Sequence, residues 1–245
     1  TDTEVILNAY IEWGISCVNK FIGMFAFAIF DHKNNKLILC RDRAGVKPLF
    51  YYNTNNLFLF GSELKSFHKH PKFKKEININ ALGLYFKKGY ISAQHCIFEN
   101  CYKLEPGHYL EIDLITKAVK KETYWDVINF YNKPKLDIGD QEAMSKIEDL
   151  LISACNYRMV SDVPVGVFLS SGYDSTTVAA LLQSNASKPI KTFTIGFEEA
   201  AYNEAEDAKK IAAHLGTSHF EHYCTEKDAL SLINDLPQMC DEPLG

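Results

Sequence analysis

An apolar run that stops at a short hydroxyl-rich turn and then resumes is the feature that most restricts how this chain folds. Residues 165–169 (VGVFL) are apolar, residues 170–177 (SSGYDSTT) are rich in serine and threonine, and residues 178–182 (VAALL) are apolar again. This order predicts a buried strand, a loop and a helix. Gly172 lets backbone N–H groups approach an anion closely, and the helix N-terminus adds the positive end of its dipole. The segment therefore predicts an anion-binding loop whose natural ligand is pyrophosphate.

The same segment excludes one common type of nucleotide site. A P-loop NTPase requires the sequence Gly-Lys-Ser/Thr, which occurs nowhere in the chain. A different nucleotide chemistry is implied. The alternative interpretation is a serine-rich loop that merely ends a buried strand, and the loop alone does not separate the two.

Strands and helices alternate downstream of the loop. Residues 191–197 (KTFTIGF) predict a second strand, and residues 203–216 predict a helix with Asn203 as its N-cap and Gly216 as its stop. Residues 219–223 predict a third strand, followed by a helix from about residue 225 to 236. This alternation predicts a parallel sheet, in which ligands bind at the C-terminal ends of the strands. The loop and the end of the second strand are therefore expected to be neighbours.

The first half of the chain has a different pattern. Short aromatic-rich segments are separated by polar, asparagine-containing turns, which predicts antiparallel hairpins. The expected strands are residues 24–30, 36–41, 48–52, 57–60, 107–112 and 118–124, with helices over residues 2–10 and 64–70. An antiparallel meander with packed helices makes an α+β domain.

The hydroxyl-rich loop resembles the SGGxDS signature of the PP-loop ATP pyrophosphatases, with Ser171 where the first glycine is usual and Tyr173 where an aliphatic residue is common. These enzymes hold the β- and γ-phosphates of ATP and leave the α-phosphorus open to attack. The resemblance implies ATP and Mg²⁺ as cofactors, with Asp174 as the metal-binding residue; its alternative role is helix capping. The residues implied to bind ATP or pyrophosphate are Leu169, Ser170, Ser171, Gly172, Asp174, Ser175 and Ile195.

The upstream half resembles the glutamine amidotransferase domain of glutamine-hydrolysing asparagine synthetases. The resemblance rests on blocks that follow one another in order, at residues 1–7, 23–28, 41–52, 62–65 and 104–109. In that family an N-terminal cysteine attacks the glutamine carboxamide. This chain begins with Thr1, which implies a fragment whose nucleophile lies upstream and which contains no catalytic residue of its own. Asp2 matches a family aspartate that binds the α-ammonium group of glutamine.

The two resemblances together imply an ATP-dependent, glutamine-hydrolysing amide ligase. Aspartate, glutamine and ATP would give asparagine, glutamate, AMP and pyrophosphate through an acyl-adenylate, and the fragment alone would be inactive. Three alternatives stay open: an amidotransferase acting on a sugar-acid carboxylate in surface-polysaccharide synthesis, a cyclase similar to β-lactam synthetase, and a non-catalytic adenylate-binding relative. The implied partners are small molecules, namely glutamine and aspartate or another carboxylate, with a homodimer possible in the full-length protein.

The implied organisation is an incomplete α+β domain of the N-terminal nucleophile hydrolase type followed by an incomplete α/β domain of the PP-loop, HUP-like type. We expect the first over residues 1–126, a linker over 127–140 and the second over 141–245. Within the first domain, Arg41 and Arg43 are expected to have a structural role, with Asp42 and Glu63 as their carboxylate partners.

The composition indicates the cellular compartment of the protein and which classes of ligand to expect. Seven scattered cysteines, an odd number, favour reduced thiols and a cytoplasmic protein. The sequence contains no apolar run of membrane-span length and does not begin with a secretory signal, so we expect no membrane association. The basic run at residues 69–75 could suggest nucleic-acid binding, but the net charge of −5 favours a solvated loop and no nucleic acid. Histidine and cysteine pairs lack a second half at zinc-site spacing.

Overall fold

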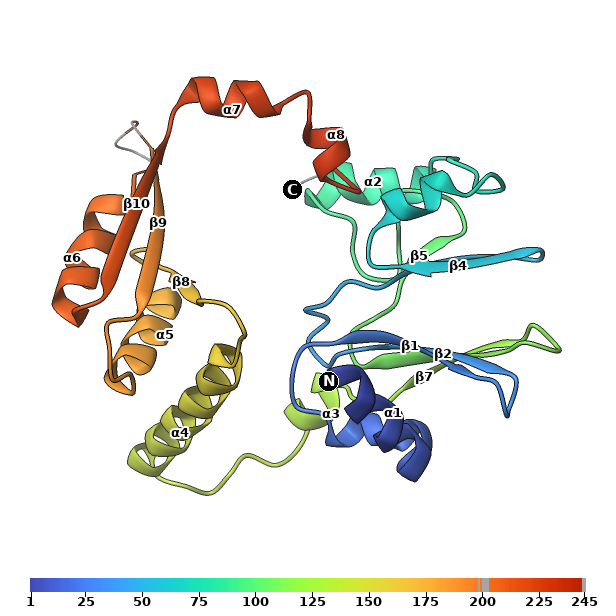
Figure 1. Cartoon of the computed structure of the whole chain (residues 1–245), viewed down its shortest axis with the longest axis horizontal. Coiled ribbons are helices and arrows are strands. Elements are labelled where there is room, and N and C mark those ends of the chain that lie inside the picture. Colours follow the sequence, from blue (N-terminus) through green and yellow to red (C-terminus); the bar gives the residue numbers. More distant parts are fainter. Residues whose placement is uncertain (198, 200–202, 244–245) are drawn as a thin grey trace. The chain divides into compact units, whose positions relative to one another are not determined.

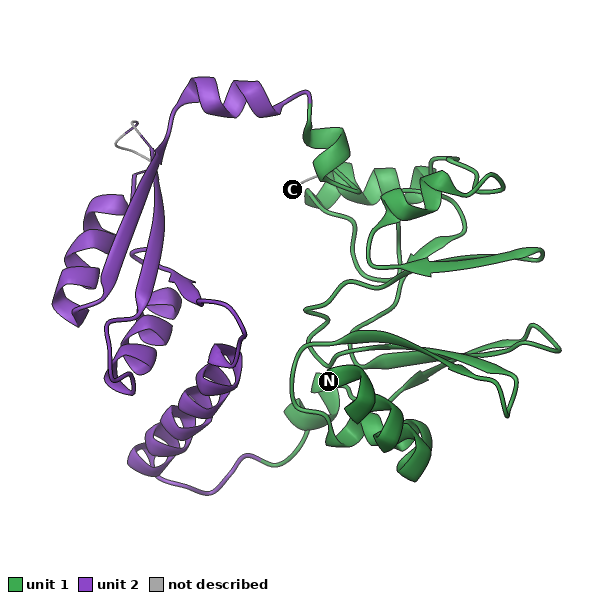
Figure 2. Cartoon of the chain, viewed as in Figure 1, with its two compact units in different colours: residues 1–134, 235–245 green, residues 135–234 purple. Residues whose placement is uncertain are grey.

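The computed structural model describes residues 1–197, 199 and 203–243. Its contacts divide the chain into two compact units, which Figure 2 colours separately. Unit 1 comprises Thr1–Pro134 together with Asp235–Gly245, and unit 2 comprises Lys135–Asn234. The described residues 235–243 therefore belong to the first unit.

Unit 1 contains two antiparallel sheets (Figure 1). Sheet A has the order β1-β2-β6-β7 and sheet B the order β4-β3-β5. The strands of sheet A are β1 (Ala26–Asp31), β2 (Lys36–Arg41), β6 (His108–Asp113) and β7 (Val119–Thr123). Those of sheet B are β3 (Phe50–Thr54), β4 (Leu57–Gly61) and β5 (Cys101–Lys103). The expectation of a single meander is wrong, because β2 pairs with β6 across the chain and β3 and β4 form a separate sheet.

The buried clusters show that unit 1 has four layers. Alternate side chains of a strand point to opposite faces, so each sheet contributes to two cores. One core joins α1 (Asp2–Trp13) and the 3₁₀ helix η1 (Gly14–Lys20) to sheet A through Ala9, Cys17, Val18 and Cys40. A second lies between the sheets and consists of Leu39, Leu49, Leu104, Leu110 and Ile112. The third joins sheet B to the 3₁₀ helix η2 (Leu64–Lys69) and to α2 (Ile79–Lys88) through residues that include Tyr52, Leu64, Phe67 and Ala81.

Helix α2 and strand β5 are among the elements of unit 1 that the sequence did not predict. Helix α2 carries ordinary end signals: the Asn78 side chain accepts from the Ala81 N–H at 2.9 Å, and Gly89 ends the helix in the left-handed conformation. Strand β5 is only three residues long and pairs with β3, which is about fifty positions away in the sequence. A strand that short has no detectable period.

Unit 2 is built around a three-stranded sheet of order β10-β9-β8, with both pairings parallel as the alternation predicted. Its strands are β8 (Gly166–Phe168), β9 (Lys191–Phe197) and β10 (Ser218–Cys224). Helices α5 (Tyr173–Ser184) and α6 (Ala205–Leu215) pack on one face through a core of Leu169, Ala179, Ala208 and Ala212. The 20-residue helix α4 (Asp140–Met159) precedes the sheet and contacts α5.

The remaining helices are short. Helix α3 (Val127–Tyr131) lies in the region expected to be a linker, and residues 132–139 after it form no helix or strand. Helix α7 (Glu226–Leu232) begins with a capping box between Thr225 and Asp228, and α8 (Leu236–Met239) follows it. Within the described part of the chain, no helix is long and apolar enough to cross a membrane.

Candidate functional site

The hydroxyl-rich loop lies between β8 and α5, at the C-terminal end of β8. Ser175, in the first turn of α5, organises it: the Ser175 hydroxyl accepts from the Ser170 N–H at 3.1 Å and lies 2.9 Å from the Ser170 hydroxyl. The Ser170 hydroxyl also accepts from the Gly172 N–H at 3.2 Å. The first turn of the helix and the end of the strand are thus tied together by one pair of hydroxyl groups.

Ser171 is accommodated without backbone strain. Positive φ angles among the described non-glycine residues occur only at Asn35, Gln94, Asn100 and Lys117, so a serine fits where the signature usually has glycine. Gly172 itself is extended, with φ −71° and ψ 151°.

Glu204, just before α6, reaches the same loop. One of its carboxylate oxygens accepts from the Ser171 N–H at 3.3 Å and from the Ser171 hydroxyl at 3.1 Å. An anionic group therefore occupies donors of the loop, as a phosphate oxygen would. No local sequence pattern predicted a contact between Glu204 and the loop. Helix α6 begins one residue later than expected, because Glu204 is its N-cap while the Asn203 side chain accepts from the Ala205 N–H.

The strand end beneath the loop is fixed by a buried hydrogen bond. Leu169 is 2% exposed; its N–H donates to the Phe193 carbonyl at 2.9 Å, and its carbonyl accepts from the Thr194 hydroxyl at 2.5 Å. The backbone groups of Leu169 thus already have partners. Ile195 is different, because the β8–β9 register ends at the pair Phe168–Phe193 and β9 continues to Phe197. Ile195 therefore lies on the part of β9 that extends beyond β8, beside the loop.

Asp174 is the second residue of α5, with an exposed side chain. The described residues contain no group of three or more histidine, cysteine, aspartate or glutamate side chains able to hold a metal ion. Mg²⁺ in nucleotide sites is commonly held by one or two carboxylates together with phosphate oxygens. Among the described residues, the carboxylates of Asp174 and Glu204 lie in the loop region; they suit that arrangement and do not suit an all-protein metal site.

One side chain of the loop region is a buried donor without a partner. The Thr176 hydroxyl, in the first turn of α5, is inaccessible to solvent and makes no hydrogen bond within the described structure. Buried hydroxyl groups usually have partners. The group belongs to the same turn as Asp174 and Ser175.

The face of the unit 2 sheet opposite α5 and α6 carries an apolar cavity of about 510 Å³. Its lining includes Phe168, Phe193, Ile195 and Phe220, and the Phe193 and Phe220 rings stack with centroids 5.2 Å apart. Thr194, Glu221 and His222 also line it, but its lining surface is mainly apolar, without a set of polar groups shown to orient a small ligand. We therefore treat it as part of a sheet face and assign it no ligand.

Asp2, the predicted glutamine-binding residue, lies in the first turn of α1 in unit 1 and is exposed. The helix is capped by the Thr1 hydroxyl, which accepts from the Glu4 N–H at 3.3 Å. Each unit thus carries its own predicted residues: Asp2 lies in unit 1, and the predicted nucleotide-binding residues lie in unit 2.

The expected pairing of arginines with carboxylates in unit 1 is wrong. Arg41 donates to the carbonyls of Gly45, Lys47 and Leu104, and Arg43 donates to those of Asn19 and Phe21. Backbone carbonyls, and not carboxylates, satisfy both guanidinium groups. The structural role expected of these arginines is retained through different partners.

Asp42, 1% exposed, bonds backbone N–H groups. Its two carboxylate oxygens accept from Phe25, Ala44, Val46 and Lys47 at 3.0–3.2 Å. Glu63 pairs instead with Lys65, at 3.5 Å. Asp42 therefore organises the turn after β2, and Glu63 takes no part in it.

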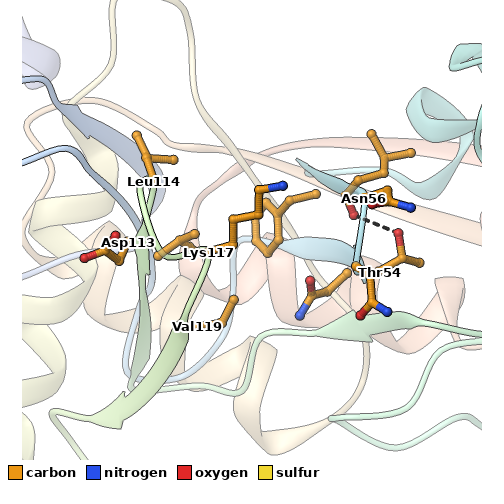
Figure 3. Close-up of a pocket in the computed structure, with 11 residues that line it drawn as sticks. Thr54, Asn56, Asp113, Leu114, Lys117 and Val119 are labelled. Atoms are coloured by element: carbon orange, nitrogen blue, oxygen red, sulfur yellow. Dashed lines mark hydrogen bonds between the residues drawn. The ribbon is translucent and has the colours of Figure 1, made fainter.

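Unit 1 has a cavity of about 660 Å³ between the β3–β4 hairpin and the β6–β7 turn (Figure 3). Thr54 and Asn56 lie on one side, with Asp113 and Lys117 on the other. The Asp113 carboxylate already accepts from the N–H groups of its own turn, at residues 115 and 116. None of the catalytic or binding residues predicted from the sequence lines this cavity, and it is given no function.

The cysteines are all free thiols, and four are buried: Cys17, Cys40, Cys96 and Cys101. Burial raises the pKa of the Cys17 and Cys40 thiols, and a hydrogen bond to Cys101 together with burial raises the pKa of Cys96. A nucleophilic cysteine needs a lowered pKa. None of these three has the properties of a glutamine nucleophile.

Comparison with known proteins follows this division of the chain. Residues 1–125 match the family model of a glutamine amidotransferase domain, and residues 146–245 match that of asparagine synthase. The chain belongs to the glutamine-hydrolysing asparagine synthetase family. The second family match ends at residue 245, although the described residues 235–243 belong to unit 1 by their contacts.

Members of this family from archaea and bacteria are similar over most of the chain. A Methanocaldococcus jannaschii protein, provisionally named asparagine synthetase [glutamine-hydrolyzing] 2, is 40% identical over 100% of this chain and 47% of its own length. Bacillus subtilis asparagine synthetase [glutamine-hydrolyzing] 3 is 33% identical over 98% of the chain and 42% of its length. The chain thus spans less than half the length of these relatives.

A solved structure of Bacillus subtilis glutamine phosphoribosylpyrophosphate amidotransferase is also similar. It shares 14% identity with a TM-score of 0.31, and the match covers 86% of this chain and 35% of that one. A likeness this distant carries no argument about function.

Proposed function

We propose that this chain is part of an ATP-dependent, glutamine-hydrolysing amide ligase that converts aspartate to asparagine. The observation that carries the proposal is the loop at residues 170–175, whose hydroxyl and backbone donors follow a parallel strand and already hold the carboxylate of Glu204. Family membership supports the pairing of this loop with a glutaminase unit.

In this proposal unit 2, a HUP-like domain, adenylates the acceptor. Ser170, Ser171, Gly172 and Ser175 bind the pyrophosphate portion of ATP, assisted by the N-terminus of α5. Main-chain groups near Leu169 and Ile195 contact the adenine. Asp174 holds Mg²⁺, which when bound neutralises the phosphate charge. The loop leaves the α-phosphorus accessible to the acceptor carboxylate, and ammonia then displaces AMP from the acyl-adenylate.

Unit 1, in the same proposal, is a domain of the N-terminal nucleophile hydrolase type that releases the ammonia. Its four layers of helix, sheet, sheet and helix support this. Asp2 binds the α-ammonium group of glutamine from the first turn of α1. We assign the nucleophile to no residue of this chain.

Product analysis of the full-length protein tests the proposal. With ATP, aspartate and glutamine labelled with ¹⁵N in its amide, we expect labelled asparagine, glutamate, AMP and pyrophosphate. Replacing aspartate by sugar acids tests the choice of acceptor. Formation of ADP and phosphate would contradict the adenylation chemistry, because it would show transfer of the γ-phosphoryl group.

The second candidate function is that of a non-catalytic relative that binds adenylate. The observation that favours it is Ser171, which stands where the signature usually has glycine. The same incubation distinguishes it, since such a protein would form neither AMP nor amide.

A further inference from the structure

Glu204 bonds the donors of the hydroxyl-rich loop that the loop does not use itself. The Ser170 N–H donates to the Ser175 hydroxyl at 3.1 Å, and the Gly172 N–H donates to the Ser170 hydroxyl at 3.2 Å. The Ser171 N–H donates instead to Glu204, at 3.3 Å, and the Ser171 hydroxyl donates to the same carboxylate oxygen at 3.1 Å. Ser171 thus supplies the donors that this turn offers to a group outside it.

The Glu204 side chain does not cap its own helix. Glu204 is the N-cap residue of α6, a position whose side chain ordinarily accepts from an N–H group of the first turn. It makes no such hydrogen bond, and the Asn203 side chain accepts from the Ala205 N–H at 3.1 Å. The carboxylate of Glu204 therefore bonds the loop without giving up a contact that the start of α6 needs.

The contact has the chemistry of a bound phosphate oxygen. Carboxylate and phosphate oxygens both carry negative charge and both accept from hydroxyl and backbone N–H donors. The hydrogens that Ser171 donates to Glu204 cannot at the same time be donated, in the same geometry, to a ligand. Glu204 is exposed, so its side chain can leave the loop without exposing a buried group. A phosphate that reaches the loop can therefore take its place.

We propose that Glu204 is an internal occupant of the phosphate-binding loop, whose carboxylate holds the Ser171 donors until a phosphate group of the ligand displaces it. This inference rests on the proposed function. A glycine in place of Ser171 would offer Glu204 its N–H alone, whereas the serine adds one donor for the occupant and for the ligand alike. The occupant weakens the affinity of the loop for pyrophosphate, the product that must leave it after adenylation.

Titration of the full-length protein with inorganic pyrophosphate tests the proposal. The titration is carried out in EDTA, so that no contact between Glu204 and Mg²⁺ enters the measurement. Glu204→Ala should lower the Kd for pyrophosphate about tenfold, because the ligand no longer has to break two hydrogen bonds and is no longer repelled by the carboxylate. Equal Kd values in the wild type and the variant, or binding by neither, would contradict the proposal.

Glu206→Ala is the matched control. Glu206 is an exposed carboxylate in the first turn of the same helix, two residues after Glu204, and within the described structure it does not bond the loop. Its removal takes the same charge from the same end of α6 and should change the Kd for pyrophosphate by no more than about twofold. An equal gain in affinity in both variants would show that charge alone weakens binding, and would overturn the occupant.

A double-mutant cycle with Ser171→Ala shows whether Glu204 acts through Ser171. In the wild type, Ser171→Ala should change the Kd for pyrophosphate by no more than about threefold, because the hydroxyl group serves both the occupant and the ligand. In the Glu204→Ala background it should weaken binding about fivefold, because the hydroxyl group then serves the ligand alone. Additive effects would contradict displacement at Ser171. If thermal unfolding shows that Glu204→Ala is not folded, Glu204→Gln replaces it, with a smaller fall in Kd expected.

The failure of this inference differs from the failure of the proposed function. A wild-type protein that forms no AMP with any candidate acceptor contradicts the proposed function, and the internal occupant with it. A wild-type protein that forms AMP, and whose Kd for pyrophosphate is unchanged by Glu204→Ala, contradicts the internal occupant alone.

Discussion

At the scale of single residues, the hydrogen-bond donors of the loop at residues 170–175 have different roles. Some hold the loop in its conformation, and others are not needed for that conformation. Ser175 bonds both the backbone and the side chain of Ser170, whereas Ser171 bonds only the exposed Glu204. The departure of Ser171 from the usual signature is therefore compatible with a working loop.

This difference predicts opposite outcomes for two substitutions in the full-length protein. Ser171→Gly should leave the Kd for ATP within about threefold, because it removes one optional donor. Ser175→Ala should weaken ATP binding by about tenfold or more, because it removes a hydrogen bond that fixes the loop. Isothermal titration measures both. ATP binding that appears only in Ser171→Gly would show that the natural loop is degenerate and would defeat the ligase proposal.

Asp42 is the clearest single-residue determinant of stability in unit 1. Asp42→Ala should lower the free energy of unfolding by about 3–5 kcal/mol, because several buried N–H groups lose their acceptor. Asp113→Ala, which removes the same kind of contact from an exposed turn, should cost much less. Urea denaturation compares the variants. Equal losses would mean that burial of the Asp42 contacts is unimportant.

At the scale of elements, the contact between β9 and the strand end beneath the loop connects the fold to nucleotide binding. Thr194 and Thr192 are both buried on the same face of β9. Thr194 bonds the Leu169 carbonyl, while Thr192 bonds Thr217 and His219. The same Thr→Val substitution can therefore be made at two positions of one strand whose hydrogen-bond partners differ.

We therefore expect Thr194→Val to weaken ATP binding about fivefold, the equivalent of one net hydrogen bond. Thr192→Val should lower stability but leave the Kd for ATP within twofold, because its partners lie away from the loop. Titration and thermal unfolding of both variants provide the measurement. Equal effects of the two variants on ATP binding would show that Thr194 acts only through general stability.

The elements show how far the sequence predicts this fold. Hairpin strands with asparagine turns, such as β1 and β2, follow from local pattern, and so does the parallel alternation of unit 2. The grouping of the antiparallel strands into two sheets depends on pairings such as β2 with β6, which no local signal determines. The hydroxyl-rich loop could be predicted from the sequence because its residues are consecutive. Glu204 was missed because its partner, Ser171, lies 33 positions away in the sequence.

At the scale of the whole molecule, unit 2 presents one covered and one exposed sheet face. Phe193, Ile195 and Phe197 alternate along β9 with exposed fractions of 38%, 52% and 40%, while the threonines between them are buried. Parallel sheets normally bury both faces. The exposed face is therefore an apolar surface that favours association in this 245-residue chain.

Sedimentation velocity over a range of concentrations should accordingly show self-association of the 245-residue chain. Phe168→Lys, which places a charge on the exposed face of β8, should reduce it. Tyr131→Lys, at an equally exposed aromatic residue of α3, should not. A wild-type chain that stays monomeric at every concentration would contradict the role given to this face.

The most direct measurement of the central claim, that the loop supports adenylation, is exchange of labelled pyrophosphate into ATP by the full-length protein. Adenylation is reversible, so exchange should require ATP, Mg²⁺ and the acceptor carboxylate but not glutamine. Asp174→Ala should abolish the exchange and spare glutaminase activity, because Asp174 lies in unit 2 and Asp2, the residue proposed to bind glutamine, lies in unit 1. Exchange that persists undiminished in Asp174→Ala, or that is absent from the folded wild-type protein supplied with each candidate carboxylate, would contradict the account.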